Sequence, residues 1–307
     1  MQLFPKAPKF WQIALILGIG VFSVSTAAIF VRLALEVTGL RETGFSLFLA
    51  ASRLIISAGI ICPNWRGIRR TPISPKAFYY AGAAGLFLAL HFAVWISSLS
   101  FTSIVAATTL VTTNPIWIAL LSQFWFKEKL KKITILSIFI TLLGGIAIAL
   151  GSSSSESLGL QPLLGNILAL IGAWFASFYL LIGREAQRQS LSTENYITIA
   201  YTVAAIVLFP FPFFFGSGYF GYPIPVYIYV FFLALFSQVI GHTTINWAVR
   251  WISPILVSLA ILFEPIGSSI LGYFIFGEQP SLMTILGAIT ILSGVAIAIL
   301  GERTKSS

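Results

Sequence analysis

The feature that most constrains this chain is a series of ten apolar runs, each about as long as a membrane-crossing helix. A helix needs roughly 20 apolar residues to cross the hydrocarbon of a bilayer. The runs that meet this length are residues 11–35, 44–62, 77–98, 103–126, 133–150, 162–183, 195–215, 225–247, 254–276 and 281–300. Charged residues make up only 9% of the chain, against about a quarter in a soluble protein. Apolar and polar residues do not alternate as in the strands of an outer-membrane barrel. The sequence therefore predicts an all-α membrane protein with ten transmembrane helices.

The second half of the chain repeats part of the first half. Residues 115–151 align without a gap on residues 265–301, and 13 of the 37 pairs are identical. Matches that a shared richness in Leu, Ile and Gly does not explain are Pro115 with Pro265, Glu128 with Glu278, and Gly151 with Gly301. Internal repeats within membrane helices are typical of transporters. We expect each repeat to contain five helices, in residues 1–151 and residues 152–307.

The basic residues predict the orientation of the chain in the membrane. Of the 18 Lys and Arg residues, 15 lie in alternate loops, counted from the N-terminus. Positive loops stay in the cytoplasm, so we expect both termini there, in a bacterial plasma (inner) membrane. Because five is an odd number, the second repeat enters from the opposite face and is inverted. The net charge of +9 comes from basic residues in the loops that orient the chain in the membrane. We therefore expect no nucleic-acid partner.

Polar residues inside the apolar runs are the candidates for function, because polar groups in hydrocarbon face the bundle interior or a cavity. Asn114-Pro115 and Glu264-Pro265 occupy equivalent places in the two repeats. Each proline removes a helix hydrogen bond, so both sites predict a break beside a polar side chain. Asn114 and Glu264 could line a substrate cavity, and Glu264 could carry a proton. The structural alternative is a kink with Glu264 bonded to a neighbouring helix.

Two histidine pairs predict opposite walls of the same cavity. His91 and Trp95 are four residues apart and share a helix face, as do His242 and Asn246 in the second repeat. Histidine titrates near neutral pH, so His91 is a second candidate for proton coupling. The alternative is ordinary hydrogen bonding between helices. Metal binding is not expected, because nothing else in the chain completes a ligand set, and we expect no cofactor.

The remaining candidates are a charge and two aromatic residues. Arg53 lies deep in its run and needs a carboxylate, backbone carbonyls or a substrate anion, and a pair with Glu264 is one hypothesis. Trp174 and Tyr179 could line a pocket for a flat or amphipathic solute, or could equally pack against helices or lipid. The glycines near positions 144 and 294 favour close packing of the fifth and tenth helices. Close packing suits structural or dimer-forming helices better than helices of a transport path, so a homodimer is left open.

The segments LLGGIAIALG and LSGVAIAILG, each preceded by a Pro and then a Glu, resemble the EamA family of the drug/metabolite transporter superfamily. The resemblance implies two inverted five-helix repeats around a central cavity, with the fifth and tenth helices peripheral. It also implies export or exchange of small metabolites such as amino acids by alternating access. Aromatic-amino-acid exporters of the family line the cavity with aromatic and polar side chains, which would correspond to His91, Trp95 and Trp174. The Trp-Gly-Ser-like element often present in the first helix is Phe22–Thr26 here, so that contact is not transferred.

The sequence thus predicts a secondary transporter of a small organic solute that contacts membrane lipid, and not an enzyme. The chain has no nucleotide-binding motif, so it is not itself an ATP-driven pump. A membrane-embedded lipid-modifying enzyme is an alternative, but such enzymes need acidic or His/Ser clusters, and this chain contains no Asp. A flippase for lipids or lipid-linked sugars is an alternative within transport. It would require a lateral opening between helices.

Overall fold

The computed structural model describes residues 8–68, 72–102, 104–125, 127, 129–152, 161–277 and 281–303, and all its regular elements are helical. The first half contains α1 (Phe10–Thr38), α2 (Thr43–Ile61), the short 3-10 helix η1 (Cys62–Asn64), α3 (Trp65–Ile68), α4 (Pro75–Ser98), α5 (Ile104–Val111), α6 (Asn114–Trp125) and α7 (Lys132–Ser152). The second half contains α8 (Pro162–Arg188), α9 (Thr193–Leu208), α10 (Phe211–Phe214), α11 (Ile224–Phe232), the π-helix η2 (Leu233–His242), α12 (Thr243–Trp251), α13 (Pro254–Ile261), α14 (Glu264–Phe276) and α15 (Leu282–Arg303).

Seven helical stretches of the described chain are long and apolar enough to cross a membrane. They are Phe10–Thr38, Thr43–Ile68, Pro75–Ser98, Leu163–Arg188, Thr193–Phe214, Ile224–Trp251 and Pro254–Phe276. Each corresponds to one of the predicted apolar runs. The other three runs correspond to the α5–α6 pair, α7 and α15. A helix satisfies its own backbone hydrogen bonds, which is the requirement for crossing hydrocarbon.

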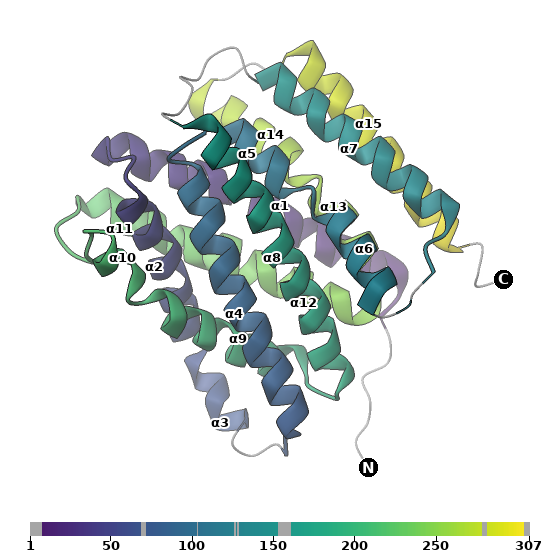
Figure 1. Ribbon diagram of the computed structural model, residues 1–307, viewed down its shortest axis with the longest axis horizontal. Coiled ribbons are helices and arrows are strands. Elements are labelled where there is room, and N and C mark those ends of the chain that lie inside the picture. Colours follow the sequence, from purple (N-terminus) through teal and green to yellow (C-terminus); the bar gives the residue numbers. More distant parts are fainter. Residues whose placement is uncertain are drawn as a thin grey trace.

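Helices from the two halves of the chain are interleaved. In Figure 1, α4 runs alongside α8 and α9. α1 packs against η2 and α14. Glycines permit close approaches of this kind: a Cβ atom on Gly20 of α1 would lie 1.8 Å from the Thr244 hydroxyl oxygen of α12. A Cβ on Gly241 of η2 would lie 2.6 Å from a methyl group of Val24. The centre of the molecule is therefore formed jointly by residues of the first and second halves.

The predicted breaks at both prolines are present. α5 ends at Val111 and α6 begins at Asn114, while α13 ends at Ile261 and α14 begins at Glu264. At the second break, the amides of Leu262 and Phe263 donate to carbonyls only three residues earlier. These tight turns place Asn114 and Glu264 at the starts of new helices in the interior of the bundle.

α7 and α15 form a pair that lies to one side of the other helices (Figure 1). Glycines set their separation, as the sequence predicts: a Cβ on Gly144 would lie 2.7 Å from the Gly287 carbonyl, and one on Gly294 would lie 2.5 Å from Thr141. A Cβ on Gly145 would meet nothing within 4 Å. Glu128 and Glu278, one of the identical pairs of the repeat, lie outside the described residues.

Candidate functional site

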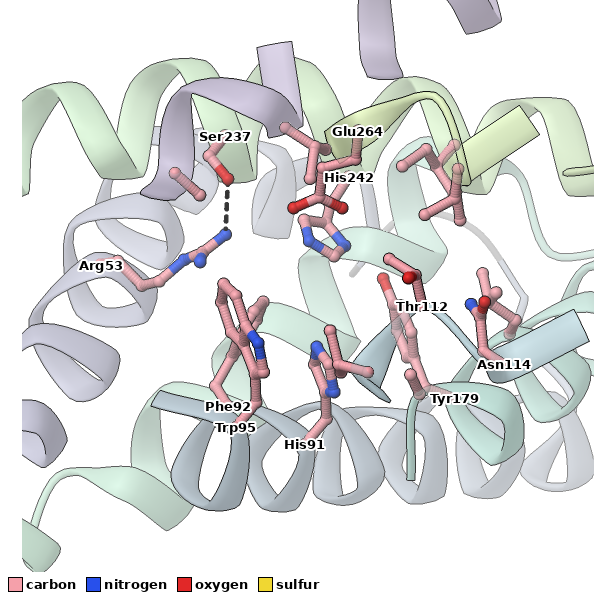
Figure 2. A pocket seen from close by; sticks show the side chains of 17 residues that line it. Arg53, His91, Phe92, Trp95, Thr112, Asn114, Tyr179, Ser237, His242 and Glu264 are labelled. Atoms are coloured by element: carbon pink, nitrogen blue, oxygen red, sulfur yellow. Dashed lines mark hydrogen bonds between the residues drawn. The ribbon is translucent and has the colours of Figure 1, made fainter. Parts of the chain in front are cut away.

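A cavity of about 60 Å³ lies where the two halves meet, lined by helices of both. A water molecule needs roughly 10–15 Å³ measured in this way, so the cavity has room for a few waters. Figure 2 shows polar and aromatic side chains converging on it from several helices. The lining residues with a polar side-chain atom are Arg53, His91, Trp95, Thr112, Asn114, Tyr179, Ser237, His242 and Glu264.

Most of the residues that the sequence predicts for the cavity are among its lining. Asn246 and Trp174 are not. Asn246 lies behind the wall: it is 2% exposed, and its side-chain amide donates a hydrogen bond to the Tyr179 hydroxyl. Trp174 is 45% exposed and packs against Trp117 and Phe178. Its ring therefore lies at the outer surface of the helix bundle, away from the cavity.

Three aromatic residues within little more than one turn of α4 form one wall of the cavity. The rings of His91 and Trp95 are parallel, with an interplanar angle of 1° and centroids 6.0 Å apart. Phe92 lies beside them and meets the His242 ring edge-on at 5.3 Å. The Nδ1 atom of His91 lies 2.9 Å from the Gly172 carbonyl oxygen on α8. A carbonyl only accepts hydrogen bonds, so Nδ1 carries the proton and Nε2 keeps its lone pair.

The predicted ion pair between Arg53 and Glu264 is not formed. No salt bridge within 4.0 Å joins these two described residues. Instead, Nη2 of Arg53 donates to Ser237 Oγ at 3.0 Å and to Gln238 Oε1 at 2.9 Å, and the guanidinium stacks on Phe92 at 4.0 Å. The physical reason is the π-helix η2, which brings two neutral oxygens of adjacent residues onto the same nitrogen.

Several polar atoms in the cavity wall are buried and have no hydrogen-bond partner among the described residues. They are Nε and Nη1 of Arg53, Nε1 of Trp95, Oδ1 of Asn114 and Nδ1 of His242. Most buried polar atoms in proteins are paired, so a cluster of unpaired ones needs an explanation. Bound water or a polar ligand supplies one. The site can therefore hold a polar solute through donors on one set of residues and acceptors on another.

The sequence model of the EamA-like transporter family matches residues 10–150 and 163–300, which is nearly the whole chain. The chain belongs to the EamA family. With its several membrane-length helices, this EamA protein is an integral, multi-pass membrane protein. Membership also indicates a transporter rather than an enzyme. In the described residues, no three His, Cys, Asp or Glu side chains come together as a metal site would require.

Relatives of this EamA protein have transporter names without an assigned substrate. It is 26% identical to the uncharacterized transporter YxxF of Bacillus subtilis over 73% of this chain and 71% of that protein. It is 25% identical to the uncharacterized transporter YyaM of the same organism over 90% of each chain. A protein of known crystal structure has the same fold, with a TM-score of 0.74 at 19% identity, over 97% of this chain and 100% of that one.

Among the residues that sequence reasoning missed are Phe92 and Ser237, which line the cavity, and Gln238, which contacts Arg53. Ser237 and Gln238 left a signal, since they are an adjacent polar pair within the apolar run 225–247. Both are completely buried at the Arg53 guanidinium. Phe92 left no signal, because a phenylalanine in an apolar run is also expected to pack against other helices or lipid.

Proposed function

We propose that this EamA protein is a secondary transporter of small organic metabolites, amino acids among them, that exports or exchanges its substrate by alternating access. One observation carries the proposal. The cavity between the two halves is lined by unpaired polar atoms of Arg53, Trp95, Asn114 and His242. A bundle that served only as a scaffold would fill this space with packed apolar side chains. A transporter needs a polar site near the midplane of the membrane.

The proposal includes ten transmembrane helices in two inverted repeats, residues 1–151 and 152–307. The three spans beyond the seven of membrane length would be the α5–α6 pair, α7 and α15. The separate matches of the family model to residues 10–150 and 163–300 support two equivalent units. The lateral position of the α7–α15 pair supports a scaffold role for these two helices. Both termini would lie on the cytoplasmic side of a bacterial plasma membrane.

The cavity of about 60 Å³ is too small for a metabolite, so it must widen before it can hold one. Opening requires some helices to move relative to the others. The breaks between Val111 and Asn114 and between Ile261 and Glu264 are suitable hinges, because interrupted helices line the sites of many secondary transporters. Proton coupling through Glu264 or His91 is part of the proposal, since both line the cavity.

A flippase for lipids or lipid-linked sugars is the second candidate, and one observation favours it. An apolar groove of about 350 Å³ lies between α1 and the α13–α15 region, lined by residues such as Leu17, Phe263 and Ile270. A groove of this kind could hold an acyl chain. Its polar surface is small, however, and none of its lining residues also lines the central cavity.

The proposal is tested by solute counterflow in proteoliposomes. The panel contains amino acids, carboxylates, nucleosides and a fluorescent phospholipid, each with and without a pH gradient. In Ala176→Phe, the new ring fills the cavity, so flux of the true substrate should fall at least about tenfold. The matched control is Ile167→Phe, on the same helix but 46% exposed, which should transport normally. Movement of the phospholipid alone would favour the flippase.

The coupling is tested in the same vesicles. If Glu264 carries the proton, Glu264→Gln should lose the response of flux to the pH gradient while exchange of substrate continues. Flux that ignores the gradient in the unmodified protein would rule out proton coupling. Absence of flux for every compound in the panel would contradict the transporter proposal itself.

A further inference from the structure

Arg53 is a buried positive charge whose hydrogen bonds are only partly satisfied. Its side chain is completely buried, and it lines the cavity. Only Nη2 has hydrogen-bond acceptors, the neutral oxygens of Ser237 and Gln238. Within the part of the chain that the structure describes, Nε and Nη1 have no partner. The N–H groups on these two nitrogens are thus available to a ligand.

The charge of Arg53 is also not balanced by contact with a carboxylate. Glu264 lines the same cavity, yet it forms no salt bridge with the guanidinium. Figure 2 shows Arg53 entering from one side of the cavity and Glu264 from another, next to His242. A buried guanidinium without a paired anion is strongly unfavourable. The site therefore gains more from binding an anion than from binding a neutral solute or a cation.

A second unpaired donor lies in the same wall. The indole Nε1–H of Trp95 is buried without a partner and, as a donor only, cannot be satisfied by another N–H group. In Figure 2, the Trp95 indole and the Arg53 guanidinium both extend into the cavity. Phe92 covers a face of the guanidinium at 4.0 Å, which holds its plane in place. Planar oxygen acceptors suit such a fixed guanidinium, because its N–H groups lie in one plane.

We infer that Arg53, with Trp95, binds the carboxylate group of an organic solute. The inference rests on the proposed transport function and assigns the substrate class of that same cavity. It is independent of whether the solute also carries an amine. The carboxylate would accept hydrogen bonds from Arg53 and from the Trp95 indole. The aromatic rings of Phe92 and His91 would contact its apolar part.

The test is calorimetric titration of the full-length protein in detergent, supported by thermal shift, with probes that differ only in charge. The probes are propionate, propionamide and propylamine, and, as a larger set, benzoate, benzamide and benzylamine. Each carboxylate should bind at least about tenfold more tightly than its amide or amine, the size of one charge-assisted hydrogen bond. Chloride and sulfate are titrated separately, to detect a site for inorganic anions.

Variants connect the binding to the two residues. Arg53→Gln should abolish the preference for carboxylate over amide. If that variant does not fold, Trp95→Phe keeps an aromatic ring and removes the N–H donor, and it should weaken benzoate binding about threefold or more. Glu264→Gln removes the negative charge from the cavity and should strengthen benzoate binding. The matched control is Trp11→Phe, whose side chain is 61% exposed on α1, and it should bind benzoate normally.

The possible results separate this inference from the proposed function. The inference is overturned if amides or amines bind as tightly as carboxylates. It is also overturned if carboxylate binding is unchanged in Arg53→Gln. Either result would leave the transporter proposal intact. Equal binding of chloride would replace the carboxylate with an inorganic anion and also overturn it. A carboxylate preference that disappears in Arg53→Gln and weakens in Trp95→Phe would establish it. A panel in which nothing binds and nothing is transported would instead contradict the proposed function.

Discussion

His91 and Arg53 have one feature in common. In each side chain, one nitrogen is hydrogen-bonded to a neighbouring helix, and another nitrogen remains for a ligand in the cavity. His91 uses Nδ1 to reach the Gly172 carbonyl at 2.9 Å and retains the Nε2 lone pair. Arg53 uses Nη2 for Ser237 and leaves Nε and Nη1 unpaired. The anchored atom contributes to stability and the second atom to ligand binding. Substitutions can therefore separate these two contributions.

His91→Asn and His91→Leu should show this separation. The amide nitrogen of an asparagine can take the place of Nδ1 and keep the bond to Gly172, so the melting temperature should stay near that of the unmodified protein. Leucine loses this bond, at about 1 kcal/mol, and should lower the melting temperature by a few degrees. Both variants lack Nε2, so both should lose substrate flux. Thermal unfolding and counterflow measure the two effects, and normal flux in His91→Asn would show that Nε2 has no role.

The sequence locates the individual residues of the cavity better than their contacts. Depth in an apolar run and equivalence between repeats were enough to select His91, Trp95, Asn114, His242 and Glu264, and all of them line the cavity. Helical spacing alone cannot fix the direction in which a ring faces, and Trp174 faces outward. The partners of Arg53 lie about 185 residues later in the chain, so only the tertiary fold identifies them.

Among the helices, the π-helix η2 is one element that the sequence does not predict. Hydropathy marks a span but not its hydrogen-bond register, and Ile224–Trp251 reads as one apolar stretch. Within it, residues Leu233–His242 adopt the wider π form, in which bonds run from residue i to i+5. That register places Ser237 and Gln238 beside Arg53. The breaks at Pro115 and Pro265 are predicted, because a proline has no backbone N–H group and removes one helix hydrogen bond.

Neighbouring glycines of α7 provide a matched test of its packing on α15. Gly144→Ala would press a methyl group against the Gly287 carbonyl, which cannot move aside. We expect destabilisation of about 1–3 kcal/mol, as for other overpacked cores. Gly145→Ala has open space and should be neutral or stabilising by up to about 1 kcal/mol. Melting temperatures in detergent report the difference.

Transport gives the second readout of this pair. Neither α7 nor α15 contributes a residue to the cavity lining, so folded Gly144→Ala protein should transport at the normal rate well below its melting temperature. Equal stability of the two variants would contradict the packing, and a specific loss of flux in Gly144→Ala would give α7 a role beyond that of a scaffold.

At the scale of the whole molecule, the two halves share one cavity, and loop charge predicts how they are oriented in the membrane. Alternate loops contain 15 of the 18 basic residues, and this pattern predicts which ends of the helices face the cytoplasm. Run lengths and charges were sufficient to predict an all-helical membrane protein. They contain no information on the distances between helices, so the size of the cavity comes only from the structure.

The most direct test of the account is the accessibility of one cysteine placed in the cavity wall. Cys62 is the single cysteine of the chain and is exposed, so Cys62→Ser provides the background for Ala176→Cys. A small membrane-impermeant thiol reagent is applied to intact cells and to inside-out vesicles. In the same assay, native Cys62 should react only in inside-out vesicles. Phe220→Cys, at a residue 91% exposed between α10 and α11, should react only in intact cells.

The account predicts that Ala176→Cys reacts from both sides, because the cavity opens alternately to each, and that a transported solute changes both rates. Reaction from one side only, or from neither side while the two topology controls react as expected, would contradict alternating access through this cavity.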